Sequence, residues 1–178
     1  PVSDVTTGEL MPMASGEITP AQITGAVKGE TGDPGELCGT LTTDECLGTL
    51  SLNTSYGIFG TMSNPCNTEK AIPMAFRQEV HTGDATILAT IEGSTPKEYD
   101  IVIEHINICD LNSSKSMVIR ITDPELLEAT GGIVCGMSGS PIIQDGRLAG
   151  AVTHVFLNDP ERGYAIFCET MLQAQEAQ

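Results

Sequence analysis

The sequence of 178 residues predicts an all-β fold of the barrel or sandwich class. Short runs rich in aliphatic and β-branched residues alternate with turns of Gly, Asn, Asp and Pro along most of the chain, a pattern typical of such folds. Helical signals are confined to one segment after residue 121 and to the last ten residues. The length suits one domain with its own hydrophobic core.

The first eighty residues carry the weaker strand signals. We expect a strand within residues 16–27 and a glycine-rich loop over residues 28–35. Short apolar segments follow at residues 47–52, 56–59 and 71–76.

The clearest strands begin near residue 85. Residues 85–91 and 100–108 are rich in β-branched side chains and are expected to pair across the turn at residues 93–96. Residues 117–121 alternate, which places Met117, Ile119 and Ile121 on one face.

A short helix is predicted next. Thr122 and Glu125 have the spacing of a capping box, Pro124 suits a first helical turn, and Gly131 suits the end of the helix. A second helix is expected over residues 169–178.

The remaining strands surround an Asp-Gly pair. Residues 141–144 and 147–155 flank Asp145 and Gly146, and such a pair between apolar runs is a strong hairpin signal. Residues 163–168 form one further expected strand.

The charge is strongly acidic, with 24 Asp and Glu against 8 Lys and Arg. Such a surface repels phosphate backbones and anionic headgroups, which argues against nucleic acid or a lipid surface as partner. The acidity fits either solubility or attraction of basic peptides. No apolar run is long enough to span a membrane.

Six cysteines occur, at positions 38, 46, 66, 109, 135 and 168. No pair has the Cys-x-x-Cys spacing of a zinc or redox site, so we expect free thiols, with disulfides as the alternative. The scattered carboxylates also lack calcium-loop spacing. We therefore expect neither a metal nor a cofactor.

The segment Gly136 to Pro141 reads Gly-Met-Ser-Gly-Ser-Pro and runs straight into the hairpin. A serine nucleophile needs a tight turn that exposes its oxygen, and backbone N–H groups aimed at the developing oxyanion. Ser138 fits the nucleophile, and the N–H groups of Gly136 and Ser138 fit the oxyanion hole. Met137 has two interpretations, as core filler or as part of the substrate cleft.

This turn resembles the chymotrypsin-like pattern Gly-x-Ser-Gly-Gly-Pro, with Ser140 in place of the last Gly. In chymotrypsin-like enzymes the strand that returns from the hairpin forms one wall of the specificity pocket. By this resemblance, Thr153 and His154 border the substrate cleft.

Longer stretches resemble the stage IV sporulation protein B peptidase family. They include residues 121–134, the Ser138 motif, 150–156 and 158–160, together with 32–37, 56–60 and 71–76. The resemblance implies a chymotrypsin-like double β-barrel within a single peptidase domain, residues 1–178. Residues up to about 80 would complete an N-terminally truncated first barrel and the crossover, and residues 81–178 would form the second barrel.

The resemblance also assigns the rest of the catalytic triad. It makes Asp123 the acid, 15 residues before Ser138, although Asp123 also suits a helix N-cap. It places the general-base histidine just before Pro1, so this chain alone is expected to be inactive. Of the histidines present, His81 reads as a surface residue and His105 as structural, and His154 is a weak substitute base.

The implied function is a serine endopeptidase of a sporulation signalling pathway. It would cleave a membrane-bound regulatory protein, through an acyl-enzyme, in the space between the mother-cell and forespore membranes. The alternative is a non-catalytic, peptidase-like module that binds a peptide, which the absent base favours.

Overall fold

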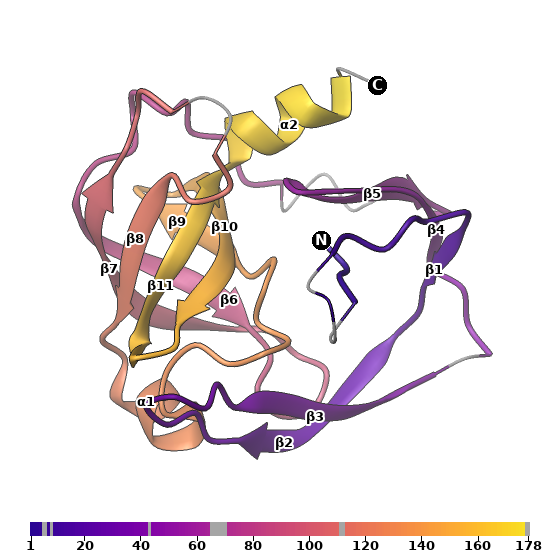
Figure 1. Cartoon of the computed structure of the whole chain (residues 1–178), viewed down its shortest axis with the longest axis horizontal. Coiled ribbons are helices and arrows are strands. Elements are labelled where there is room, and N and C mark those ends of the chain that lie inside the picture. Colours follow the sequence, from indigo (N-terminus) through magenta and orange to yellow (C-terminus); the bar gives the residue numbers. More distant parts are fainter. Residues whose placement is uncertain (5–6, 8, 43, 65–70, 111–112, 177–178) are drawn as a thin grey trace.

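The computed structural model describes residues 1–4, 7, 9–42, 44–64, 71–110 and 113–176. Six antiparallel strands close into a barrel in the order β10-β11-β8-β7-β6-β9 (Figure 1). In chain order they are β6 (Gly83–Ala89), β7 (Lys97–Ile106), β8 (Met117–Ile121), β9 (Pro141–Gln144), β10 (Arg147–Phe156) and β11 (Asp159–Phe167). The predicted pairing across residues 93–96 is present, with Ile87 opposite Tyr99. The all-β prediction is therefore confirmed.

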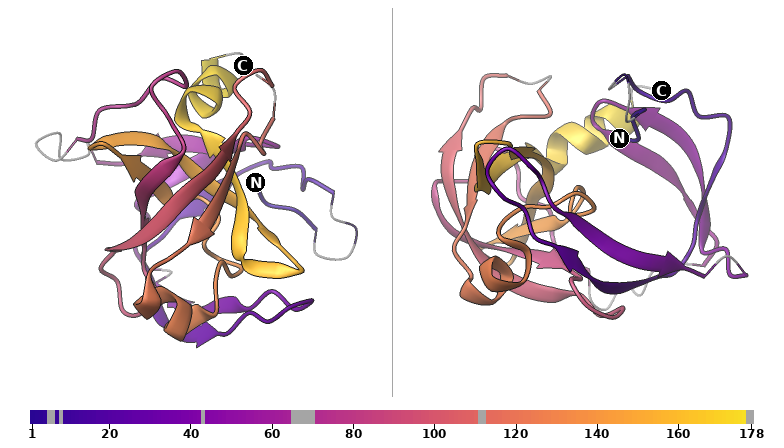
Figure 2. Two further views of the ribbon diagram at one scale, coloured as in Figure 1. Left: turned by 90° about the vertical axis from the view of Figure 1, so that its left-hand side faces the viewer. Right: turned by 60° about the horizontal axis from the view of Figure 1, so that its bottom comes forward.

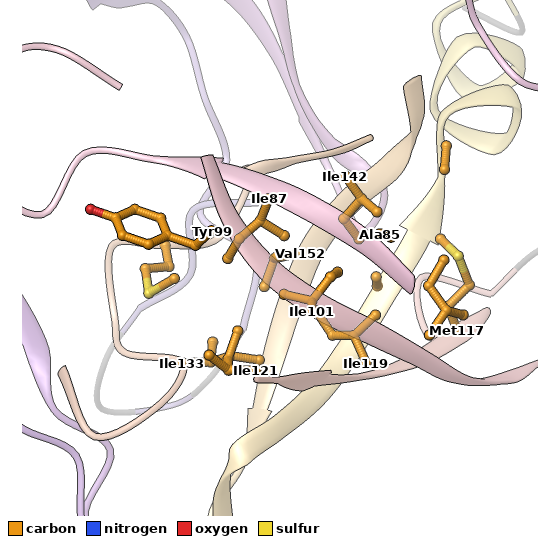
Figure 3. Close-up of a cluster of buried hydrophobic side chains, with 14 of the residues drawn as sticks. Ala85, Ile87, Tyr99, Ile101, Met117, Ile119, Ile121, Ile133, Ile142 and Val152 are labelled. Atoms are coloured by element: carbon orange, nitrogen blue, oxygen red, sulfur yellow. The ribbon is translucent and has the colours of Figure 1, made fainter. Parts of the chain in front are cut away.

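The barrel interior is filled by aliphatic side chains from alternating strand positions (Figure 3). Met117, Ile119 and Ile121 of β8 all point inward and are at most 1% exposed, as the alternation predicts. Ile101 of β7 and Ile142 of β9 join them. Burial of each such side chain stabilises the fold by about 1.5–3 kcal/mol, so the barrel is a self-contained core.

Two small sheets precede the barrel. Strands β1 (Gly16–Ile18), β4 (Gly48–Thr54) and β5 (Gly57–Met62) form one, and β2 (Ala21–Val27) and β3 (Glu36–Leu41) form a separate hairpin. Figure 2 shows this hairpin passing outside the barrel beside α1, the helix Pro124–Thr130. The sequence did not predict β3, because its residues mix Gly, Cys and Thr without alternation.

The segment 71–76, expected to be apolar, forms no named strand. It runs extended beside the hairpin of the barrel, where Ala75 N donates to Leu148 O at 3.0 Å.

Helix α1 begins one residue later than the capping-box spacing predicts. Asp123, not Thr122, is the N-cap, because its backbone is extended and its Oδ1 accepts a hydrogen bond from Leu126 N at 3.0 Å. Gly131 ends the helix at φ 72°, as predicted. The Asp145-Gly146 turn is also as predicted, with φ of 52° and 73°, the left-handed pair that a tight hairpin needs.

Helix α2 (Cys168–Glu176) follows β11 and is anchored by one arginine. Arg77 is 4% exposed, and its Nη2 lies 3.1 Å from Glu169 Oε1 and 3.2 Å from Gln173 Oε1. The Arg77 backbone N also donates to Glu169 Oε2 at 3.0 Å. The hydrogen bonds from the Arg77 backbone and side chain lower the pKa of Glu169. These contacts fix α2 to the segment that links the two halves of the chain.

Across the described ranges, no helix is long and apolar enough to cross a membrane. Five cysteines, at positions 38, 46, 109, 135 and 168, are free thiols, and Cys66 lies outside the described residues.

Candidate active site

The loop that carries Ser138 connects α1 to β9 and is pinned to strand β10. Gly139 N donates to Val152 O at 2.8 Å, and Val152 N donates to Ser140 O at 3.0 Å. Within the loop, Ser140 N donates to Met137 O at 3.0 Å, closing a tight turn around Ser138. The turn is thus held rigidly by the strand that follows the hairpin.

Two glycines give this turn its shape. Gly136 has φ 97° and Gly139 has φ 94°, backbone conformations that residues with a side chain rarely adopt. Between them Ser138 is exposed, and its Oγ donates a hydrogen bond to Thr153 O at 3.0 Å. The hydroxyl is therefore presented to solvent at the surface of the turn, as the motif predicts.

The backbone N–H groups of Gly136 and Ser138 are available to a ligand. Neither donates a hydrogen bond to any residue that the structure describes, whereas the N–H groups of Met137, Gly139 and Ser140 all do. Unpaired N–H groups beside a nucleophile are the donors that an oxyanion hole requires. The assignment of these two N–H groups to an oxyanion hole stays a prediction.

A pocket of about 210 Å³ borders the Ser138 hydroxyl. Its walls come from the Ser138 turn, β5 and the turn before it, β10, β11, α2 and the start of the chain, and none of the lining residues has a charged side chain. The lining residues are Pro1, Val2, Tyr56, Gly57, Ile58, Ser138, Gly139, Ala151, Val152, Thr153, Ile166 and Met171. The site is therefore an apolar recess with a hydroxyl at its edge.

The three residues expected at the substrate cleft lie in different environments. Thr153 lines the pocket, and its Oγ1 donates to Ser114 O at 2.9 Å. Met137 is only 1% exposed and lies in the barrel core, so the structure supports its interpretation as core filler. It points inward because the exposed Ser138 follows it on the same tight turn.

His154 is exposed on β10 and does not line the pocket. Its imidazole forms no hydrogen bond with the described residues, Ser138 included. Partial burial, then the positive charges of Lys115 and of the N-terminal amine, lower the pKa of His154. These effects disfavour the protonated imidazole, and the side chain lies outside the pocket.

Asp123 is occupied by structural contacts. Its Oδ1 caps α1, and its Oδ2 accepts a hydrogen bond from Asp100 N at 3.3 Å. It does not line the pocket beside Ser138. The N-cap interpretation is thus confirmed, and the catalytic role of Asp123 stays a prediction.

The other two histidines lie on the surface. His81, just before β6, pairs with Asp145 of the β9–β10 turn at 2.8 Å, and His105 is exposed on β7. The hydrogen bond with the Thr82 backbone, and then that with Asp145, raise the pKa of His81.

Comparison with known families identifies the chain. The profile of the SpoIVB peptidase S55 family matches residues 1–172. The chain belongs to this family. Its members are peptidases, and the family name implies the serine type and a role in sporulation. A search of curated protein sequences finds no match.

Family membership agrees with the geometry of the Ser138 turn. The matched range includes the small sheets, the barrel and most of α2. A peptidase of this family acts on a protein substrate, and the family implies a location related to sporulation.

Proposed function

We propose that this chain carries the nucleophile and the substrate pocket of a serine endopeptidase in which Ser138 attacks the scissile carbonyl. One observation carries the proposal: Ser138 is exposed on a hydrogen-bonded turn, and the N–H groups of Gly136 and Ser138 in the same loop donate to no described residue. Attack forms a bond from Oγ to the carbonyl carbon, while the hydroxyl proton passes to a base. The two N–H groups stabilise the oxyanion, and the amine leaves with that proton. Water then hydrolyses the acyl-enzyme.

The base is supplied by a histidine that precedes Pro1 in the family pattern. Pro1 and Val2 line the same pocket as Ser138, so a residue joined to the Pro1 nitrogen would lie near this pocket. Val2 is itself held in place, because Asn53 Oδ1 accepts from Val2 N at 2.9 Å and Asn53 Nδ2 donates to Val2 O at 2.6 Å. Asp123 completes the triad as the group that orients the base.

The pocket indicates which substrate residue is held beside the scissile bond. With no charged side chain in its lining, the recess would leave a buried Lys, Asp or Glu side chain without a side chain of opposite charge. A small or medium uncharged side chain fits a pocket of about 210 Å³. The substrate is a regulatory protein of sporulation held at a membrane, cleaved in the space between the mother-cell and forespore membranes.

A fluorophosphonate probe tests this proposal, because it reacts with activated serines. We expect labelling of the chain extended upstream of Pro1, and little labelling of residues 1–178 alone. Ser138→Ala should abolish labelling, and Ser140→Ala, two residues away on the same loop, should retain it. Labelling that persists in Ser138→Ala would contradict the assignment.

The alternative is a non-catalytic module that holds a peptide. The bond from Ser138 Oγ to Thr153 O favours it, because no described histidine takes the proton of that hydroxyl. This alternative predicts no labelling of either chain, while a peptide with an aliphatic residue still binds.

A further inference from the structure

The β2–β3 hairpin touches the Ser138 loop at the residue that precedes the oxyanion hole. Leu37 N donates to Cys135 O at 2.8 Å, and Cys135 N donates to Gly35 O at 2.7 Å. These reciprocal bonds form a parallel bridge between Glu36 and Cys135. The N–H and the C=O of Cys135 are therefore both bonded to the start of β3 and the residue before it.

The bond to Cys135 O also fixes the N–H of Gly136. The Cys135 C=O and the Gly136 N–H belong to one planar trans peptide unit, and they point in opposite directions. While Leu37 N–H holds the carbonyl toward the hairpin, the Gly136 N–H must point away from the hairpin. Rotation of this peptide unit would turn the N–H toward β3 and remove one donor from the oxyanion hole.

The Leu37 side chain also packs against Gly136. At Gly136, the space that a Cβ would occupy lies 3.1 Å from Leu37 Cβ and 3.4 Å from its Cδ1. Leu37 is partly buried and packs against the barrel core. Because Gly136 has φ 97° and close packing on Leu37, the Gly136 backbone is stabilised in a conformation that only glycine adopts readily.

The hairpin that supplies Leu37 lies outside the barrel. Strands β2 and β3 pair only with each other as a sheet, and the six barrel strands close without them. The hairpin is attached through short contacts such as Ile23 N to Gly93 O at 2.7 Å and Gly29 N to Thr130 O at 2.8 Å. Figure 1 shows β2 and β3 apart from the barrel strands. The Cys135–Gly136 peptide is thus bonded to an element separate from the barrel.

We propose that Leu37 is a positioning residue for catalysis: its backbone N–H orients the Cys135–Gly136 peptide so that the Gly136 N–H faces the oxyanion. Docking of the β2–β3 hairpin thus sets whether the oxyanion hole is formed. The inference rests on the proposed function of Ser138, since it concerns how that site is assembled.

Proline substitution tests the N–H directly, because proline lacks this donor. Leu37→Pro in the full-length protein is compared with Leu41→Pro. The N–H of Thr42 points toward β2, because Thr42 N donates to Pro20 O. N–H groups alternate in direction along a strand, so the N–H groups of Leu41 and Leu37 both point away from β2. Leu41 is 69% exposed and lies four residues beyond Leu37, so its proline variant controls for strand damage.

We expect Leu37→Pro to lower kcat for a peptide substrate by about 10²–10³, the loss measured when one oxyanion donor is removed. KM should change little, because the lost interaction exists only in the transition state. The affinity for a peptide aldehyde, which forms a tetrahedral adduct, should fall with kcat, and the affinity for the cleaved peptide product should not. Leu41→Pro should retain wild-type kcat.

A second variant keeps the test decisive if Leu37→Pro fails to fold. Incorporation of the α-hydroxy analogue of leucine at position 37 replaces only the N–H by an ester oxygen, and Leu37→Ala removes only the packing on Gly136. An unchanged kcat in the ester variant, with Ser138→Ala inactive, would overturn the role of Leu37 and leave Ser138 as nucleophile. Activity that survives Ser138→Ala would overturn the proposed function itself.

Discussion

The Arg77–Glu169 ion pair gives the sharpest prediction about stability. Arg77 is 4% exposed, and its Glu169 partner has 19% of its side chain exposed. Arg77→Met keeps the length of the side chain but removes the guanidinium. Among the described residues, the Glu169 carboxylate would then keep two donors. They are the backbone N–H of residue 77, at 3.0 Å, and Gln173 Nε2, at 3.4 Å.

Loss of one partner from a buried ion pair costs about 3–5 kcal/mol. In a protein of this size 1 kcal/mol lowers Tm by roughly 2–4 °C, so Arg77→Met should lower Tm by about 6–20 °C. Thermal unfolding followed by far-ultraviolet circular dichroism measures this shift. Since Met171 of α2 lines the pocket, KM should also rise.

Arg147→Met is the matched control. Arg147 Nη1 lies 4.0 Å from Glu79 Oε1, and both side chains are more than 40% exposed. Such a pair contributes about 0–1 kcal/mol, so Tm should fall by at most a few degrees. Equal shifts for the two variants would refute the argument from burial.

A double variant tests the cause of the loss. Arg77 Nη1 is buried and has no hydrogen-bond partner among the described residues, so within that part of the chain the guanidinium is incompletely satisfied. Glu169→Gln added to Arg77→Met removes the isolated charge and should restore more than about 1 kcal/mol. No recovery would show that lost packing, and not the unpaired carboxylate, causes the destabilisation.

Three further predictions concern the cap, the charge network and the oxyanion loop. Asp123→Asn should preserve the free energy of unfolding within about 0.5 kcal/mol, because Asn caps helices as well as Asp does. If Asp123 orients the base, the same variant should lower kcat by about 10⁴. An unchanged kcat would limit Asp123 to capping. Hydrogen bonds from arginines on β8 and β11 lower the pKa of Glu104 against the opposing effect of burial. A carboxylate whose pKa is lowered in the folded state stabilises the fold at pH values above its unfolded pKa of about 4.3, and this stabilisation is lost as the pH falls. Urea titration should therefore show that the stability difference between wild type and Glu104→Gln shrinks from pH 7 to pH 3. Gly136→Ala should cost about 1–2 kcal/mol in backbone strain and reduce kcat, whereas Gly146→Ala, with φ 73° and no atoms near its Cβ position, should show similar strain in urea unfolding and retain kcat.

The barrel could be predicted from sequence because its local signals agree with its tertiary contacts. Met117, Ile119 and Ile121 alternate on a strand with one buried face, and Asp145-Gly146 has the turn conformation that its residues favour. Helix α1 was predicted with its N-cap one residue early, because Thr122 and Asp123 are both good caps and only the backbone conformation separates them.

The first half was predicted less well because its elements depend on contacts distant in sequence. Strand β3 lacks a periodic apolar pattern and is stabilised by pairing with β2 and with Cys135. The contribution of Leu37 to the site could not be found from sequence, since 98 residues separate Leu37 from Cys135. The division of the chain near residue 80 into two barrel parts stays a prediction.

Peptide mapping of the fluorophosphonate adduct tests the central claim most directly. The full-length protein is labelled, digested and analysed by mass spectrometry, with Ser138→Ala treated in parallel. Nucleophilic catalysis at the Gly136–Pro141 turn predicts a single adduct on Ser138 of the wild-type protein and none in the variant. An adduct on another residue, or no adduct in a protein that still cleaves its substrate, would contradict it.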